Sequence, residues 1–136
     1  MCFIISEPDL APKIAEKDII CYKWLEHQLK SPYIGYTYEL KKLNKKINLK
    51  INPPYNSYQG SYFFIDKGYH SYITDTKSFF DIYISIIPKG STYYQNLDTN
   101  EYVSNQIVIL CKKTWINNLI TKFKIRFNIP LKYEKN

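Results

Sequence analysis

The chain has 136 residues, of which 45% are hydrophobic and 17% aromatic, enough for a single domain with its own core. This composition excludes a disordered chain, which has few aromatic residues and little to bury. The net charge of +7 comes almost entirely from lysine, because Arg126 is the single arginine. Lysine is a hydrated point charge, whereas base-specific and bidentate phosphate contacts favour arginine. The charge indicates either attraction to an anionic partner without sequence reading or a lysine-rich solvated surface.

The three cysteines, Cys2, Cys21 and Cys111, are odd in number and far apart. They form neither a metal-binding pair nor a disulfide framework, which favours a reducing compartment. Cys21 and Cys111 lie in apolar runs and are expected to be buried small hydrophobic residues. No stretch approaches the roughly 20 apolar residues of a membrane span. We therefore expect a cytoplasmic protein with no membrane partner.

Runs rich in β-branched and aromatic residues alternate with turn residues along most of the chain. Lysines alternate with apolar residues around Lys50, as on an edge strand protected against pairing. Turns are expected at Pro88–Gly90 and at residues 98–100. We predict strands over residues 2–5, 19–25, 36–40, 47–51, 62–65, 69–73, 81–87 and 102–111.

Two helices are predicted among these strands. Thr74–Thr76 has the oxygens to cap a short helix over residues 77–81, and Thr114 caps a C-terminal helix. That helix is expected to pack on the sheet through one apolar face, formed by Trp115, Ile116, Leu119, Ile120 and Phe123. The fold class is therefore α+β: a mixed or antiparallel sheet with one or two short helices and a C-terminal helix, in one domain over residues 1–136.

Polar residues interrupt several strand-like runs in the second half of the chain. His70 is either a group lining a ligand cleft or a half-buried histidine bonded to the backbone, and Glu101 is either a ligand-binding carboxylate or a solvated turn residue. Ser104 and Asn105 either bind a ligand or pair with a neighbouring strand. The candidate ligand-binding residues are Tyr22, Lys23, His70, Ser71, Tyr72, Glu101, Ser104 and Asn105, with Glu101 and His70 as candidate catalytic groups.

Metal and nucleotide-hydrolysis motifs are incomplete in this sequence. His27 and His70 are the only histidines and have no acidic or cysteine partners at metal-ligand spacing, so no metal is expected. Lys89-Gly90-Ser91-Thr92 resembles the end of a phosphate-binding loop in reversed order. It lacks the upstream glycines that form the nest of amide donors, which excludes a P-loop NTPase.

The C-terminal segment is strongly basic, with Glu134 as its only acidic residue. Aromatic and basic residues alternate over residues 122–129, which fits a strand with one packed face and one face towards an anion. The alternative is an edge strand with solvated lysines. The candidate anion-binding residues are Lys112, Lys113, Lys122, Lys124 and Arg126.

The order of these phrases resembles a family of small uncharacterised domains found in phages, large DNA viruses and bacteria. The resemblance covers roughly residues 19–110. It is carried by Tyr22-Lys23, by Gly68-Tyr69-His70-Ser71-Tyr72, by Ile86-Ile87-Pro88-Lys89-Gly90-Ser91-Thr92-Tyr93-Tyr94 and by Glu101-Tyr102-Val103-Ser104-Asn105-Gln106-Ile107. The resemblance implies no activity for this chain.

More distantly, the layout is similar to the ADP-ribosyltransferase fold. In that fold a first strand supplies an Arg or His, a second segment supplies Ser-Thr-Ser or a Tyr, and a third strand begins with a glutamate behind a Pro-x-Gly turn. Glu101 matches the glutamate, and Ser71 or Tyr72 falls near the second segment. Cys21-Tyr22-Lys23 departs from the first position, whose residue normally holds the dinucleotide. The resemblance implies a fold more than a reaction.

Three functions follow from the sequence. The first is a small viral or phage-type protein in the host cytoplasm that binds an anionic partner: a nucleotide-derived ligand, a nucleic acid or an acidic host protein. It would require no cofactor, and antagonism of host defence is one such role. The second, implied by the resemblance, is an NAD-dependent ADP-ribosyltransferase-like enzyme with Tyr22, His70, Ser71 and Glu101 at its site. The third is a self-associating structural accessory protein, a homo-oligomer joined through exposed tyrosines.

Overall fold

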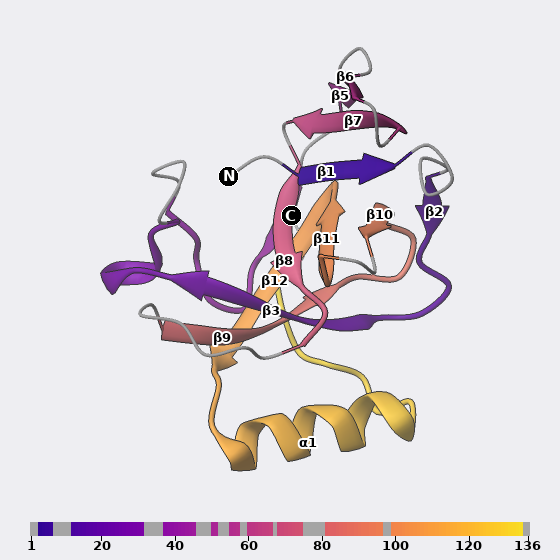
Figure 1. Ribbon diagram of the computed structural model, residues 1–136. Coiled ribbons are helices and arrows are strands. Elements are labelled where there is room, and N and C mark those ends of the chain that lie inside the picture. The colour runs from indigo at the N-terminus through magenta and orange to yellow at the C-terminus, as the bar shows by residue number, and fades with distance from the viewer. Residues whose placement is uncertain are drawn as a thin grey trace.

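An antiparallel β-sheet with one helix against it dominates the protein, as the computed structural model in Figure 1 shows. The structure describes residues 3–6, 12–31, 37–45, 50–51, 55–57, 60–66, 68–74, 81–96 and 99–134. A single-turn 3-10 helix, His27–Leu29, follows the strand Ile19–Leu25. The fold is thus broadly α+β, with the sheet predominant. The helix expected over residues 77–81 lies outside the described residues, except for Asp81, which begins a strand.

The larger sheet contains eight described strands, and all of its ladders are antiparallel. The predicted strands over residues 19–25 and 81–87 are confirmed, and they pair with each other along their full length. In spatial order the strands are β2 (Lys13–Ile14), β10 (Thr92–Asn96), β11 (Glu101–Ser104), β8 (Tyr69–Tyr72), β3 (Ile19–Leu25), β9 (Asp81–Ile87), β12 (Gln106–Lys112) and β4 (Leu43–Lys45).

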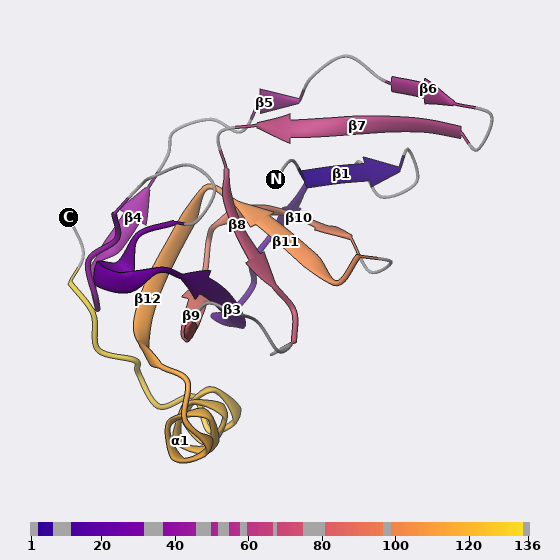
Figure 2. The same cartoon turned by 60° about the vertical axis from the view of Figure 1, so that its left-hand side comes forward.

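A smaller antiparallel sheet lies beside β10 and β11, and Figure 2 shows it as a separate layer above them. Its central strand β7 pairs with each of the other three. The strands are β1 (Phe3–Ser6), β5 (Lys50–Ile51), β6 (Tyr55–Ser57) and β7 (Gly60–Asp66).

The larger sheet buries apolar side chains on both faces, because successive residues of a strand point to opposite sides. One face carries a cluster formed by Tyr22, Ile84, Ile86, Val108 and Leu110, and the C-terminal residues Ile125 and Leu131 pack against it. The opposite face carries a second cluster that includes Cys21, Leu25, Tyr38, Tyr69, Tyr102, Ile107 and Ile109. This two-sided burial explains why β9 and β12 are nearly continuous apolar runs.

The C-terminal helix α1 (Trp115–Arg126) starts as predicted, because the Thr114 hydroxyl accepts a hydrogen bond from the Asn117 amide at 3.1 Å. Its packing is the reverse of the expected one. The side chains of Trp115, Leu119 and Phe123 are 75%, 62% and 54% exposed, so the prediction that they pack on the sheet is wrong.

The helix contacts the sheet through its more polar side instead. Thr121 is the one buried residue of α1, Ile125 packs on the apolar cluster around Ile84, and the Tyr22 hydroxyl donates to Asn118 Oδ1 at 2.6 Å. A hydrogen bond to a specific partner on β3 sets the rotation of the helix, and the apolar periodicity alone cannot reveal such a bond.

Three further predictions need correction. Residues 37–40 form isolated bridges rather than a strand, through Thr37 and Leu40. The single strand expected over residues 102–111 is broken at Asn105 into β11 and β12. The strand expected over residues 122–129 is helical as far as Arg126, because α1 continues to that residue from the Thr114 cap.

We predict that truncating a buried side chain lowers the free energy of unfolding, whereas truncating an exposed one leaves it almost unchanged. Ile84→Ala removes a side chain with no exposed surface and should lower the free energy of unfolding by about 2–5 kcal/mol. Trp115→Ala removes a larger side chain that is 75% exposed and should change it by no more than about 0.5 kcal/mol. Urea unfolding followed by circular dichroism measures both, and a Trp115→Ala loss as large as that of Ile84→Ala would contradict the orientation of α1.

Candidate functional site

Strands β3, β8 and β11 bring four of the candidate residues to one region of the sheet. Tyr22 lies opposite Tyr72 in the β3–β8 ladder, and Tyr72 lies opposite Glu101 in the β8–β11 ladder. His70, two residues before Tyr72, therefore shares their face. His70 Nε2 contacts Glu101 Oε2. The sequence placed Tyr22, His70, Ser71 and Glu101 at one site, and the structure brings His70 and Glu101 of this set into contact.

Two aromatic rings adjoin the histidine side of this pair. The rings of Trp24 and Tyr72 stack with centroids 4.2 Å apart, and the ring of His70 meets the Tyr72 ring edge-on at 5.1 Å. The side chains of His70 and Glu101 retain 19% and 13% exposure. Trp24 Nε1 is buried and has no hydrogen-bond partner among the residues that the structure describes. The cluster thus combines a half-buried pair of titratable groups with flat apolar surfaces.

A histidine that shares a proton with a carboxylate has a defined orientation and can act as a general base or acid through its other nitrogen. The Tyr72 ring is only 8% exposed and therefore offers little surface to a ligand. The contact with His70 equally gives a half-buried carboxylate a hydrogen-bond partner, which a buried polar group needs.

The side chains of Lys23 and Ser71 point to the opposite face of the sheet, where both are buried. Lys23 is only 6% exposed; its Nζ donates to the His70 carbonyl at 2.5 Å and lies 5.1 Å from the centroid of the Tyr38 ring. Ser71 has no exposed surface. Their positions separate them from the face that carries His70 and Glu101.

Ser104 and Asn105 form the corner between β11 and β12. Ser104 Oγ donates to the Gln106 carbonyl at 2.8 Å. The amide of Thr92 donates to Asn105 Oδ1 at 2.9 Å, and the Asn105 amide donates to the Thr92 carbonyl at 3.0 Å. Asn105 thus pairs with β10, whereas the hydrogen bond of Ser104 is local to the corner.

The described cysteines are poor nucleophiles. Burial raises the pKa of the Cys21 thiol to about 12, although a hydrogen bond with Ser71 and the charge of Lys23 act in the opposite direction. Burial also raises the pKa of Cys111, against the lowering effect of the nearby Lys41 and Lys124. Both thiols stay protonated at neutral pH, and only the thiolate attacks.

The candidate anion-binding residues occupy α1 and the strand end before it. Lys122 and Arg126 are exposed, whereas Lys113 and Lys124 are half-buried. Lys112 is exposed and pairs with Asp81 at 3.3 Å. The Arg126 guanidinium lies 5.8 Å from the centroid of the Phe127 ring. Lys122 and Arg126 are therefore the cations most accessible to a large partner.

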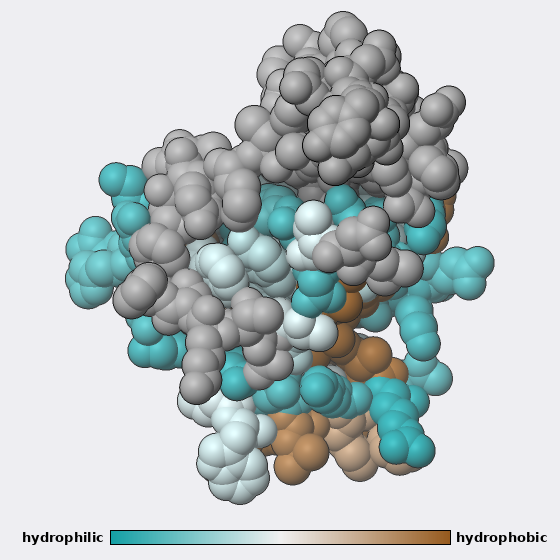
Figure 3. Space-filling view, in the orientation of Figure 1, coloured by the Kyte–Doolittle hydropathy of each residue, from teal (hydrophilic) through white to brown (hydrophobic). Residues whose placement is uncertain are grey.

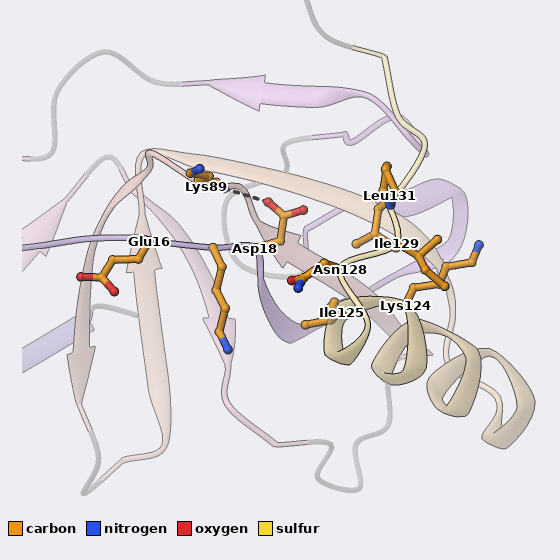
Figure 4. A pocket seen from close by; sticks show the side chains of 10 residues that line it. Glu16, Asp18, Lys89, Lys124, Ile125, Asn128, Ile129 and Leu131 are labelled. Atoms are coloured by element: carbon orange, nitrogen blue, oxygen red, sulfur yellow. Dashed lines mark hydrogen bonds between the residues drawn. The ribbon is translucent and has the colours of Figure 1, made fainter.

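A groove of about 290 Å³ lies at the C-terminal end of α1, between the residues that precede β3 and the segment that follows the helix. Figure 4 shows Lys89 and Lys124 at this groove together with Glu16 and Asp18, and Asp18 Oδ1 accepts a hydrogen bond from the Lys89 amide at 2.8 Å. Carboxylate and ammonium groups are mixed along the groove, so its electrostatic potential is not of one sign.

Two residues of functional interest were missed from the sequence. Asn118 orients α1 through Tyr22, and Trp24 provides the stacked ring beside Tyr72. An asparagine in the middle of a helix was the available signal for the first, because asparagine disfavours helix interiors unless its side chain has a partner. The alternation of Tyr22 and Trp24 on one strand was the signal for the second.

Among the described residues, no three His, Cys, Asp or Glu side chains are grouped to hold a metal ion. No helix in the described part of the chain has the length and apolar character needed to cross a membrane. No protein family, curated protein or solved structure matches the chain. The site must therefore be interpreted from its own geometry.

The bond between Tyr22 and Asn118 is expected to act as a structural link. In a double-mutant cycle of Tyr22→Phe and Asn118→Ala, the two losses of unfolding free energy should be non-additive by about 0.5–1.5 kcal/mol. Asn117→Ala is the matched control, because the Asn117 side chain donates to the Lys112 carbonyl instead, and its effect should add to that of Tyr22→Phe. Additivity in both cycles would exclude the link.

Proposed function

We propose that this protein acts by binding an anionic partner through the basic surface of its C-terminal segment, residues 112–132. The observation that carries this proposal is charge of one sign on an exposed helix. Lys122 and Arg126 are exposed on α1, and the sequence contains no Asp or Glu between Lys112 and Tyr133. Such a surface attracts anions over a distance of about 8–10 Å at physiological ionic strength.

Binding fits this arrangement better than catalysis does. The basic side chains belong to a rigid element that is fixed to the sheet at Asn118 and Thr121. Apart from the Lys112–Asp81 pair, the ion pairs described in the chain lie elsewhere, at Lys42–Glu39 and at His70–Glu101. The resemblance to phage and viral domains supports a role in the host cytoplasm, with antagonism of host defence as one form of it.

The charge proposal can be tested on heparin–agarose, a generic polyanion. Replacing Lys122, Lys124 and Arg126 together by Gln should reduce the slope of log retention against log salt by roughly three. The control replaces Lys13, Lys41 and Lys45, exposed lysines outside the segment, and should leave more of the slope intact. Stability should change little, because Lys122 and Arg126 are exposed and Lys124 is partly exposed, and exposed charges contribute about 0–1 kcal/mol each. Equal losses in the two variants would mean that only net charge matters.

A second candidate function is an NAD-dependent ADP-ribosyltransferase-like reaction on a fold of that kind. The contact between His70 and Glu101 favours it, because the resemblance assigns Glu101 the place of the glutamate of that fold. The rings of Tyr22 and Tyr72 lie on the same face but are only 3% and 8% exposed, so they offer little surface to a nucleotide. The burial of Ser71 and the engagement of the Tyr22 hydroxyl by Asn118 leave fewer groups for the dinucleotide.

For this second candidate, isothermal titration with NAD should show binding, and incubation with NAD should release nicotinamide. Glu101→Gln should abolish turnover, by at least about 100-fold if Glu101 acts in proton transfer, without loss of the folded state. Glu16→Gln, an exposed carboxylate distant in sequence, is the control and should keep full turnover. Failure of the parent protein to bind NAD or to release nicotinamide would exclude this function.

A further inference from the structure

The outward side of α1 is its apolar side, and nothing in the described chain covers it. Besides Trp115, Leu119 and Phe123, the side chains of Phe127 and Ile116 are 57% and 49% exposed. Figure 3 shows apolar residues gathered at the lower end of the molecule, where α1 lies in Figure 1. We call this surface the α1 ridge. It consists of Trp115, Ile116, Leu119, Ile120, Phe123 and Phe127.

We infer that the α1 ridge inserts into the surface of an anionic lipid bilayer. This inference rests on the proposed function and names the chemistry of the anionic partner. An apolar patch of several hundred Å² on a protein surface marks a protein or membrane contact, and three aromatic rings that are more than half exposed reach that size. The ridge therefore requires a partner that is apolar as well as anionic.

The dimensions of α1 suit a helix that lies in the plane of the membrane. Its 12 residues correspond to about 18 Å, far less than the roughly 30 Å core of a bilayer. Interfacial helices combine Trp, Phe and Leu on one side with Lys and Arg beside them and have low overall hydrophobicity. The expectation of no membrane partner came from the lack of a spanning segment, and an interfacial helix needs none.

The position of the charges favours lipid over a second copy of the chain. Arg126 follows Leu119 by seven residues and Phe123 by three, so it lies on the ridge side of the helix. A symmetric contact between two ridges would bring Arg126 and Lys122 against a helix without a single acidic residue. At a bilayer, the long stems of Arg and Lys lie along apolar surface while their charged groups reach the phosphates.

Lipid is also favoured over an acidic protein. All basic residues of the segment except Arg126 are lysines, which attract a diffuse layer of anions and lack the planar geometry of bidentate pairing. The ridge is a continuous row of apolar side chains at positions 115, 119, 123 and 127, without a polar group other than Arg126 to select a partner. A fluid surface accepts such a row without shape complementarity.

The test is co-sedimentation of the full chain with large unilamellar vesicles of phosphatidylcholine alone, or of phosphatidylcholine with 30 mol% phosphatidylserine. The parent should bind the anionic vesicles at least tenfold more tightly than the neutral ones. Leu119→Ser with Phe123→Ser should weaken this binding at least tenfold, with an unchanged melting curve because both side chains are more than half exposed. The matched control, Ile14→Ser with Leu40→Ser, changes two exposed apolar residues elsewhere and should bind like the parent.

Three outcomes would overturn the inference. One is the absence of binding to phosphatidylserine vesicles, and another is equal binding by the parent and the Leu119→Ser, Phe123→Ser variant. In the third, light scattering shows that the parent is a dimer and the variant a monomer, and neither binds vesicles. That result would assign the ridge to self-association. Heparin retention that depends on Lys122, Lys124 and Arg126, together with no vesicle binding, would leave the proposed function intact and remove only the lipid.

Discussion

The attachment of α1 through its polar side is the constraint on which the surface chemistry of this protein depends. The Tyr22 phenol donates to Asn118, and Thr121 is buried beside it, so the helix cannot rotate without leaving a buried polar group unpaired. Such a group costs about 1–3 kcal/mol. With this rotation fixed, the apolar and cationic side chains of α1 face outward together, and their proximity is what gives the surface a function.

The corner at Ser104 and Asn105 has a similar effect on the opposite end of the sheet. It ends β11 and sends the chain into β12, on the far side of β8, β3 and β9. Because β11 then pairs with β8, Glu101 comes within contact of His70. Polar residues that resemble a ligand set in the sequence are thus partly the means by which the backbone turns.

The two regions differ in the partners they suit. The side chains of His70 and Glu101 contact each other and are only 19% and 13% exposed, so they present little surface to a large partner. The helix presents exposed cations and no acid, which suits an extended anionic surface. The two regions are compatible in one molecule, because they use different elements of the sheet and different side chains.

Much of the fold follows from local patterns. Alternation and β-branched runs predicted the strands over residues 19–25 and 81–87, and Thr114 predicted the start of the helix, because these signals act between near neighbours in sequence. Among the candidate residues, the strand-start phrases were enough to suggest that His70 and Glu101 lie together. Short strands are harder to predict from the sequence, and β2, β4, β6 and β10 were missed.

The amino-acid sequence by itself determined the net positive charge, the strand-rich class, the capped helix and the absence of acidic residues from its last quarter up to Glu134. Only the tertiary structure decided which side of α1 faces the sheet, which side of its strand carries Lys23, and that Ser104 and Asn105 form a corner. The physical reason is that periodicity reveals that a helix has an apolar side but not what covers it. That choice depends on contacts between residues 96 positions apart, such as Tyr22 and Asn118.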